Sequence, residues 1–423
     1  MSNQDLSRII NELLNIAVFG KHNFMNLGKD AAIKIFGEEN TAVSFISVGK
    51  LRIFDQRTRE LYKLAGVIIS RNYALVSFQR ALCELLFNLN SANKQATKED
   101  WINFRNELIQ RPDVTIHSLM PIYGIEMSSP KVHLGKFIIY NPAHITNLLK
   151  SDYPNNKYLT DDNLSNDNNY RIGLTVNAKD YQKCYDLADQ AFTSFEYIAN
   201  FATAHFHKNS RISIFNHIKI DDVVNLAVTL DKMQSSTKDG SSLKTVVIDD
   251  AYYRESNGNE YLWEWITSDE RTNLQQKLID AMEWAGKALT EPDDARALLQ
   301  YIIAIEATLQ FDEGKFIVPS IVSHLSDMVA FLLGDAYEDR LAYAGYIKNL
   351  YKQRSALTHS GKGAISDYDL HTAHVLTQKI IRKIISNDQM RTFKTKAELC
   401  NYLISLKYGA TICDNIVLKA KEN

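Results

Sequence analysis

Cysteine and proline are both scarce in this 423-residue chain, which has four cysteines and seven prolines. The cysteines form no CxxC pair and do not have the spacing of a zinc finger; they are Cys83, Cys184, Cys400 and Cys413. Isolated cysteines in a chain of this length are typical of reduced thiols in the cytoplasm. The sequence therefore predicts neither a disulfide framework nor a thiol-bound metal.

Long apolar runs are also absent. No window approaches the ~18 uninterrupted apolar residues that a membrane-spanning helix needs. Residues 1–20 contain no basic leader, and Asn11, Glu12 and Asn15 interrupt their apolar residues. This pattern predicts an amphipathic helix rather than a signal peptide. We therefore expect a cytoplasmic protein that has no membrane partner.

Several catalytic motifs are missing as well. The chain has no P-loop, GxSxG or HExxH motif, which excludes the commonest nucleotide-hydrolysing, serine-hydrolase and zinc-protease sites. Two histidine pairs, His205 with His207 and His371 with His374, have no third ligand at a recognisable spacing. His374 lies near the apolar side of its predicted helix, so we expect a hydrogen-bonded core histidine there. We expect no metal and no cofactor.

Neither sign of charge is in excess over the whole chain, whose net charge is -2. The content of 45% hydrophobic and 23% charged residues is that of an ordinary globular protein. The charges are unevenly distributed, because the window from Arg340 to Lys396 holds eleven basic and only three acidic residues, a balance of +8. A basic surface of this kind suits a polyanion. A solvated helix face is the commoner explanation of such a run.

Five of the seven prolines lie between Pro112 and Pro154, so turns divide this segment more than its flanks. Before it, Tyr73–Asn90 has the pattern of a helix, and a strand pair is predicted at Phe45–Phe54 and Leu64–Ser70. From the start of this segment onward, apolar and polar residues alternate with the period of a strand. This alternation predicts strands at Leu134–Tyr140, Ile172–Val176 and Leu243–Ile248.

We expect an α+β fold class with two domains. Residues 1–265 form a mixed N-terminal domain, with the alternative of a mostly helical part at 1–111 and a strand-rich part at 112–265. Residues 266–423 form an all-helical domain with a short C-terminal extension. Five apolar stripes at helical spacing follow one another there, the fourth at Glu338–Ser360, and their short connections predict an up-down bundle.

The fourth of these helices contains the residues that suggest chemistry. Its core-facing stripe runs through Tyr343, Ile347 and Leu350, and the next position is Arg354, where a buried arginine is costly unless it reaches solvent or a charged partner. His359 follows in the last turn, where the helix dipole favours the imidazolium. Five residues correspond to about 7.5 Å along the axis and about 140° around it, so the two side chains do not face each other. A shared site would need fraying of the last turn or a second copy of the helix. A snorkelling arginine and an exposed histidine are the simpler explanation.

The segment NLYKQRSALTHSG (Asn349–Gly361) resembles the signature of the Apea-like branch of the HEPN domain family, with an aromatic residue before Arg-Ser and a histidine after four intervening residues. Ala281–Leu289 and Leu298–Leu309 resemble the first two helices of that branch, including its Trp and its Ile-Glu-Ala core. The resemblance covers about residues 273–387.

The resemblance implies a metal-independent endoribonuclease. RNA supplies its own 2′-hydroxyl nucleophile, so the enzyme needs only proton transfer and a cation on the developing phosphorane. His359 would transfer protons, and Arg354 would hold the non-bridging oxygens. Glu306 would orient Arg354 or, equally, be a buried carboxylate that pairs two helices. Tyr351 and Ser355 are auxiliary candidates.

The same resemblance implies RNA as the partner and a homodimer formed through the helices that bear the motif. The candidate RNA-binding side chains are Lys352, Lys362, Lys379, Arg382 and Lys383. A toxin-like or antiphage effector is implied, whose N-terminal domain senses a phage or cellular trigger or presents RNA. The alternatives are a non-catalytic HEPN module that binds RNA or protein, and a structural helical adaptor.

Overall fold

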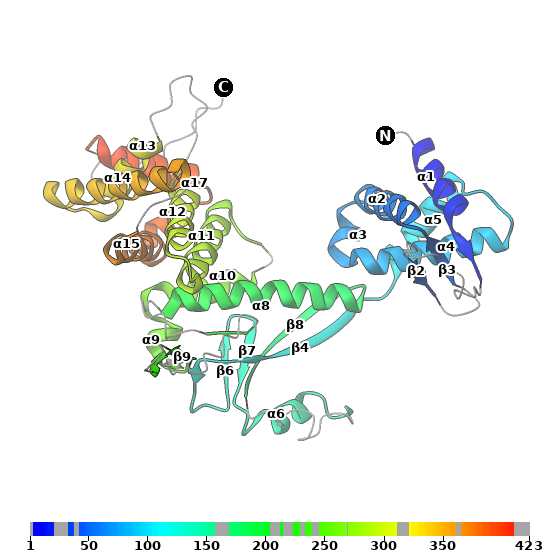
Figure 1. Ribbon diagram of the computed structural model, residues 1–423, viewed down its shortest axis with the longest axis horizontal. Helices are drawn as coiled ribbons and strands as arrows, with labels where there is room; N and C mark the ends of the chain where they lie inside the picture. The colour runs from blue at the N-terminus through cyan, green and yellow to red at the C-terminus, as the bar shows by residue number, and fades with distance from the viewer. Residues whose placement is uncertain are drawn as a thin grey trace. The chain divides into compact units, whose positions relative to one another are not determined.

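The computed structural model describes residues 3–20, 33–37, 42–156, 169–203, 212–214, 223–228, 233–238, 245–268, 270–310, 321–360 and 365–409. The fold class is α+β, with mixed strands and helices in the N-terminal region and helices alone at the C-terminal end (Figure 1). The chain forms two compact units, Met1–Ser118 with Thr175–Gln190 and Leu119–Leu174 with Ala191–Asn423. The second unit therefore takes in residues on both sides of the boundary expected at 265.

The first unit combines a small antiparallel sheet with helices. The strand order is β1-β3-β2, from β1 (Val18–Phe19), β2 (Ile33–Phe36) and β3 (Val43–Ile46). The helices are α1 (Asn3–Ile16), α2 (Val48–Leu64), α3 (Val67–Asn72), α4 (Leu75–Ser91) and α5 (Lys98–Gln110). Phe45 of the sheet stacks on Phe54 of α2 with 4.1 Å between ring centroids, and both are fully buried. An aromatic core thus joins the sheet to α2.

The strand pair predicted at Phe45–Phe54 and Leu64–Ser70 is wrong. Only the start of the first segment lies in β3, and most of the rest belongs to α2 and α3. Phe54, Thr58 and Leu61 are fully buried at helical spacing, whereas a short apolar run by itself does not distinguish a strand from a helix. The prediction of a helix at Tyr73–Asn90 is confirmed by α4.

The strand-rich segment forms a four-stranded sheet in the order β4-β8-β7-β6. Its strands are β4 (Val114–Ile122), β6 (Lys131–Leu134), β7 (Phe137–Tyr140) and β8 (Tyr170–Ala178). The single strand predicted at Leu134–Tyr140 is a hairpin, because Gly135 has a φ of 61° and turns the chain between β6 and β7. The strand predicted at Ile172–Val176 is confirmed by β8.

Shorter elements complete the middle of the chain. They are β5 (Ile125–Glu126), α6 (Ile145–Asp152), β9 (Val223–Val228), β10 (Met233–Lys238), β11 (Val246–Val247), α9 (Ala251–Arg254), the 3-10 turn η2 (Ser256–Gly258) and α10 (Asn259–Thr267). β9 and β10 pair antiparallel, and β11 pairs parallel to β5. Of the strand predicted at Leu243–Ile248, the structure describes residues 245–248, and β11 covers two of them. His205 and His207 lie outside the described residues.

Sequence analysis did not identify the long helix α8 (Tyr181–Thr203). Its second half carries the fully buried Phe192 and Phe195, and Phe137 of β7 packs on Phe195 with 4.7 Å between centroids. Gly286 lies against this half of α8, where a Cβ at position 286 would come within 1.8 Å of the carbonyl oxygen of Tyr197. The two backbones can approach this closely only because residue 286 has no side chain.

A helix is present at each of the five positions predicted in the C-terminal region (Figure 1). They are α11 (Asn273–Thr290), α12 (Asp294–Leu309), α13 (Ile321–Leu333), α14 (Tyr337–Ser360), α15 (Asp367–Ser386), α16 (Asp388–Arg391) and α17 (Lys396–Lys407). α11 packs on α12 and α13 on α14, while α12 also contacts α14 and α15. Among the described residues, no helix combines the length and apolarity that crossing a membrane requires.

Candidate active site

The buried stripe predicted on α14 leads to Arg354. Ile347 and Leu350 are buried in the bundle, and Tyr343 is half-buried at the start of the stripe. The Arg354 side chain, one turn beyond Leu350, is 37% exposed. The arginine is therefore partly withdrawn from solvent but still accessible from it.

A carboxylate on the neighbouring helix α12 holds this arginine. Nη1 of Arg354 lies 3.1 Å from Oε1 of Glu306, whose side chain is only 16% exposed. The hydroxyl of Tyr351 donates to the same Oε1 at 2.6 Å. The guanidinium carbon of Arg354 also lies 5.4 Å from the centre of the Tyr351 ring. The contact is compatible with both roles considered for Glu306, orientation of Arg354 and pairing of α12 with α14.

The environment keeps Tyr351 protonated. Burial, the hydrogen bond to Glu306 and the charge of Glu306 together raise the pKa of the Tyr351 hydroxyl far above its ordinary value. The hydroxyl thus remains a donor, and the oxygen of Glu306 that accepts from it also pairs with the guanidinium of Arg354. Among the described residues, no other ion pair or hydrogen bond engages the guanidinium of Arg354. Its exposed side is available to an anion.

The sequence pointed to Tyr351 only as an aromatic neighbour of the motif. Its structural role comes from spacing, because Tyr351 precedes Arg354 by three residues and so shares its face of α14. In the sequence, the position of Tyr351 directly after the core-facing Leu350 was the feature that could have indicated a buried tyrosine hydroxyl. The hydroxyl of a buried tyrosine needs a partner, and Glu306 is that partner.

His359 belongs to the last turn of α14, which stays helical through Ser360, but its side chain lies outside the described residues. The hydroxyl of Thr358 donates to the carbonyl oxygens of Arg354 and Ser355 at 3.1 Å each, within this regular turn. The last turn is therefore not frayed. Positions 354 and 359 remain about 140° apart around the helix.

The basic candidates for RNA contact have different environments. Lys352 on α14 and Lys383 on α15 are exposed, as is the auxiliary residue Ser355. Lys379 is exposed too, but its Nζ lies 3.2 Å from the hydroxyl of Tyr343. Lys362 lies outside the described residues.

Arg382 is half-buried, and its guanidinium is engaged by other groups of the protein. Its Nη2 donates to the carbonyl oxygen of Ala202 at 3.0 Å, its Nε donates to Gln378 at 2.9 Å, and its Nη1 lies 3.4 Å from Oδ1 of Asn259. The guanidinium also lies over the ring of Phe201. Arg382 thus joins α15 to α8 and α10, and it is a structural contact.

Two further cations of the +8 window are also used internally. Arg391 lies over the ring of Tyr261 at 3.9 Å and donates to the carbonyl oxygen of Ile385. Lys396 donates to the carbonyl oxygen of Ala307 near the end of α12, and burial lowers the pKa of its ammonium. The basic window is therefore not one continuous solvent-facing surface.

His374 is a core histidine, as expected. It is 3% exposed, and its Nδ1 lies 3.2 Å from the hydroxyl of the buried Tyr301. Within the described ranges, no three His, Cys, Asp or Glu side chains gather as a metal site would require.

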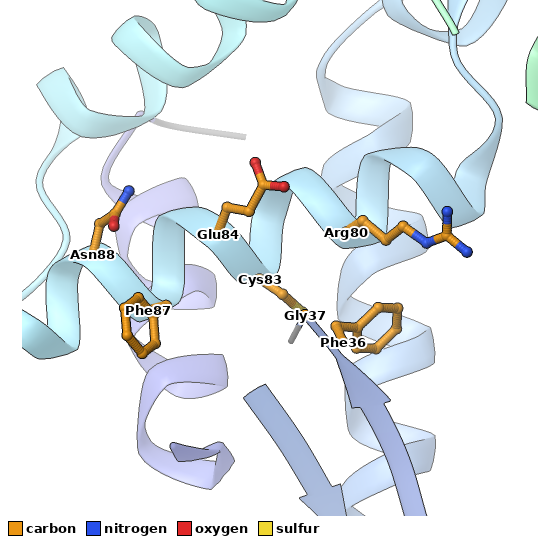
Figure 2. Close-up of a pocket in the computed structure, with 7 residues that line it drawn as sticks. All are labelled: Phe36, Gly37, Arg80, Cys83, Glu84, Phe87 and Asn88. Carbon is orange, nitrogen blue, oxygen red and sulfur yellow. The ribbon is translucent and has the colours of Figure 1, made fainter. Parts of the chain in front are cut away.

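The first unit contains a cavity of about 470 Å³ between α4 and the end of β2 (Figure 2). Arg80, Glu84 and Asn88 line it at four-residue intervals along α4, and Cys83 lies at its inner side. Figure 2 shows the side chains of Arg80 and Glu84 extending in different directions. No predicted site residue lines this cavity.

Comparison of the chain with protein-family models, with curated proteins and with solved structures gives no match. The site around Arg354 must therefore be interpreted from its own geometry and from the sequence motif.

Proposed function

We propose that this chain is a metal-independent endoribonuclease of the HEPN type that acts in the cytoplasm. The observation that supports it most is the half-exposed Arg354, held by Glu306 at 3.1 Å, while Tyr351 holds the same carboxylate oxygen. An arginine that served only to pair two helices would not need an accessible face. A fixed guanidinium with one free side suits the charge that develops on a phosphate.

The reaction would be an intramolecular transesterification. The 2′-oxygen of the RNA attacks the adjacent phosphorus, and the bond from phosphorus to the 5′-oxygen breaks. One proton leaves the 2′-hydroxyl and one reaches the departing 5′-oxygen, and His359 would serve in these transfers. Arg354 would bind the non-bridging oxygens. The products are a 2′,3′-cyclic phosphate and a 5′-hydroxyl.

Glu306 and Tyr351 are positioning residues in this scheme. The ion pair between Arg354 and Glu306 limits the rotation of the guanidinium. The hydroxyl of Tyr351 in turn limits the movement of Glu306. Orientation of this kind matters because small misplacements of a catalytic group are costly in rate.

The active form would be a homodimer formed through α14. Because the helix is regular through Ser360, one copy does not bring Arg354 and His359 to one face. The first half of α14 exposes Tyr337 and Leu341, which lie about 40° apart around the helix and which a second copy would cover. An antiparallel partner would bring His359 of one copy towards Arg354 of the other. A toxin-like or antiphage role is proposed on the motif alone.

The test is cleavage of a labelled RNA in EDTA by the full chain. Arg354→Ala and His359→Ala should each lower the rate by at least about a hundredfold and leave the dimer intact. The melting temperature should be unchanged in His359→Ala and should fall in Arg354→Ala, because Glu306 then loses its cation. The matched control is Arg296→Ala, which removes an exposed arginine from α12, the helix that bears Glu306. If His359→Ala cleaves at the parent rate, the catalytic assignment is wrong.

The second candidate is a non-catalytic module that binds RNA. Its support is the pair of exposed lysines, Lys352 and Lys383, near the motif. Retention of the labelled RNA by the parent protein without any cleavage would favour this alternative.

A further inference from the structure

The turn from α2 to α3 in the first unit exposes aliphatic side chains. Val67 is 62% exposed and Ile68 50%, and Leu64 is exposed at the end of α2. The neighbouring Ile69 is fully buried and fixes the rotation of α3, so Val67 and Ile68 cannot turn inward at the same time. Adjacent exposed aliphatic side chains on a small unit mark a contact surface.

Basic side chains surround these residues. On α2, Arg52, Arg59 and Lys63 are exposed and lie within about 40° of one another, opposite the buried stripe. Within the part of the chain that the structure describes, none of the three forms an ion pair or hydrogen bond through its side chain. Arg71 is exposed on α3. We call the surface formed by Leu64, Val67, Ile68, Arg59, Lys63 and Arg71 the α2–α3 corner.

A further cation approaches from α5. Nε of Arg105 donates to the carbonyl oxygen of Ala65 at 2.9 Å, directly at the turn. Its Nη2 lies 3.9 Å from the position that a Cβ would occupy on Gly66. The guanidinium therefore adds positive charge between the two helices.

The acidic residues nearby are engaged with other groups. Glu60 pairs with Arg57 at 3.0 Å, and Asp55 accepts a hydrogen bond from Gln79. Asp186 accepts a hydrogen bond from Gln182. The basic stripe of α2 is thus left uncompensated by the acids of its own helix.

We propose that the α2–α3 corner docks on an anionic lipid surface. Val67 and Ile68 would enter the headgroup region while Arg59, Lys63 and Arg71 contact lipid phosphates. Lipid interfaces accept aliphatic and basic side chains together. Surfaces that bind single-stranded nucleic acid use aromatic side chains for stacking, and the corner has none. Docking on a lipid surface needs no membrane-spanning helix. The expectation of no membrane partner was based on the lack of long apolar runs, which bears only on spanning helices.

The probe is a set of vesicles, one of neutral phosphatidylcholine and one containing phosphatidylserine, sedimented with the full chain. Binding should occur on the anionic vesicles and weaken with added salt, because screening shortens the reach of the charges. Lys63→Gln with Arg71→Gln should weaken binding about 25-fold, at about fivefold for each charge. Val67→Ser with Ile68→Ser should weaken vesicle binding at least about tenfold, because the variant has no aliphatic groups at these positions to bury in the headgroup region.

Matched controls keep the result specific. Lys94→Gln with Lys98→Gln makes the same charge change at exposed positions of the first unit, and Val76→Ser removes an exposed aliphatic group from α4. Neither should alter vesicle binding, and all variants should keep the parent melting temperature. Equal binding to neutral vesicles, or none to anionic ones, overturns the proposal. Salt-sensitive RNA binding lost in the Gln variant but kept in the Ser variant would assign the corner to nucleic acid instead. Lipid docking does not depend on whether the chain cleaves RNA.

Discussion

Arg354 on α14 and Glu306 on α12 form an ion pair, with 3.1 Å between Nη1 and Oε1. The pair connects the helix that bears the Arg-x4-His motif to the helix that bears the Ile-Glu-Ala segment. Two parts of the chain that suggested one family by their sequence therefore meet at one point of the structure.

Glu306→Gln keeps the shape of the side chain and a hydrogen-bond acceptor but removes the charge that holds Arg354. We expect RNA cleavage to fall about tenfold to a hundredfold, because the guanidinium loses its fixed orientation. The melting temperature should change little. Cleavage in EDTA and a melting curve measure both effects, with Glu338→Gln, an exposed carboxylate on α14, as the control. An unchanged rate would mean that Glu306 only pairs the helices.

Tyr351→Phe removes the hydroxyl that donates to Glu306 at 2.6 Å. Loss of a hydrogen bond to a buried charged group should lower the free energy of unfolding by about 1.5–3 kcal/mol. Tyr343→Phe is the control, since the hydroxyl of Tyr343 contacts only the exposed Lys379 among the partners found for it, and should cost at most about 0.5 kcal/mol. Urea unfolding compares the two. Equal losses of unfolding free energy in the two variants would show that the hydrogen bond to Glu306 stabilises the fold no more than an exposed one.

Arg354→Lys should be as inactive as Arg354→Ala, because an ammonium does not reproduce the two-pronged hold on phosphate oxygens. Combining Arg354→Ala with His359→Ala should reduce cleavage little beyond either single change, because both groups act in one transition state. Single-turnover rates on one RNA measure this. Independent, multiplicative losses would argue that the two residues serve separate steps.

Arg382→Ala should destabilise the fold rather than weaken RNA binding. The change leaves Ala202 and Gln378 without their donor, and we expect a loss of about 2–4 kcal/mol in the free energy of unfolding. Lys383→Ala, at the next position, should stay within about 0.5 kcal/mol and lower the salt slope of RNA binding by about one ion. Unfolding curves and salt titrations separate the two effects. If Arg382→Ala instead left stability unchanged and lowered the salt slope of RNA binding, Arg382 would belong to the binding surface.

Asp249 should make stability depend on acid. Burial opposes its ionisation, but hydrogen bonds from the amides and hydroxyls of Ser128 and Ser129 outweigh burial and lower its pKa to about 2. A depressed pKa adds stability that is present above the unfolded value of about 3.9 and disappears as pH falls through about 2. After allowance for solvent screening this amounts to about 1 kcal/mol. Asp249→Asn should therefore melt earlier than the parent at pH 7, and the difference between them should shrink as pH falls from about 4 to 2. If the difference in melting temperature stayed constant between pH 7 and pH 2, ionisation of the Asp249 carboxylate would not be its cause.

The sequence predicted the C-terminal helices well because their signals are local. Apolar stripes at helical spacing and the side-chain caps Asp293 and Ser366 act within a few residues of each helix end. The same method failed at α2, where the local pattern was compatible with a strand as well as a helix. Packing of Phe54 against Phe45 favours the helix there, and that contact depends on the sheet beside it.

The sequence by itself determined that an arginine continues the buried stripe of α14, and that the next conspicuous residue, His359, lies on another face of the same helix. Only the tertiary structure decided which charges are used inside the protein. Glu306 forms an ion pair with Arg354, while Arg382 donates hydrogen bonds to Ala202 and Gln378. Helix periodicity states which face a residue occupies, but the partner on that face depends on how two distant helices cross. A count of basic residues therefore overestimated the basic surface that faces solvent.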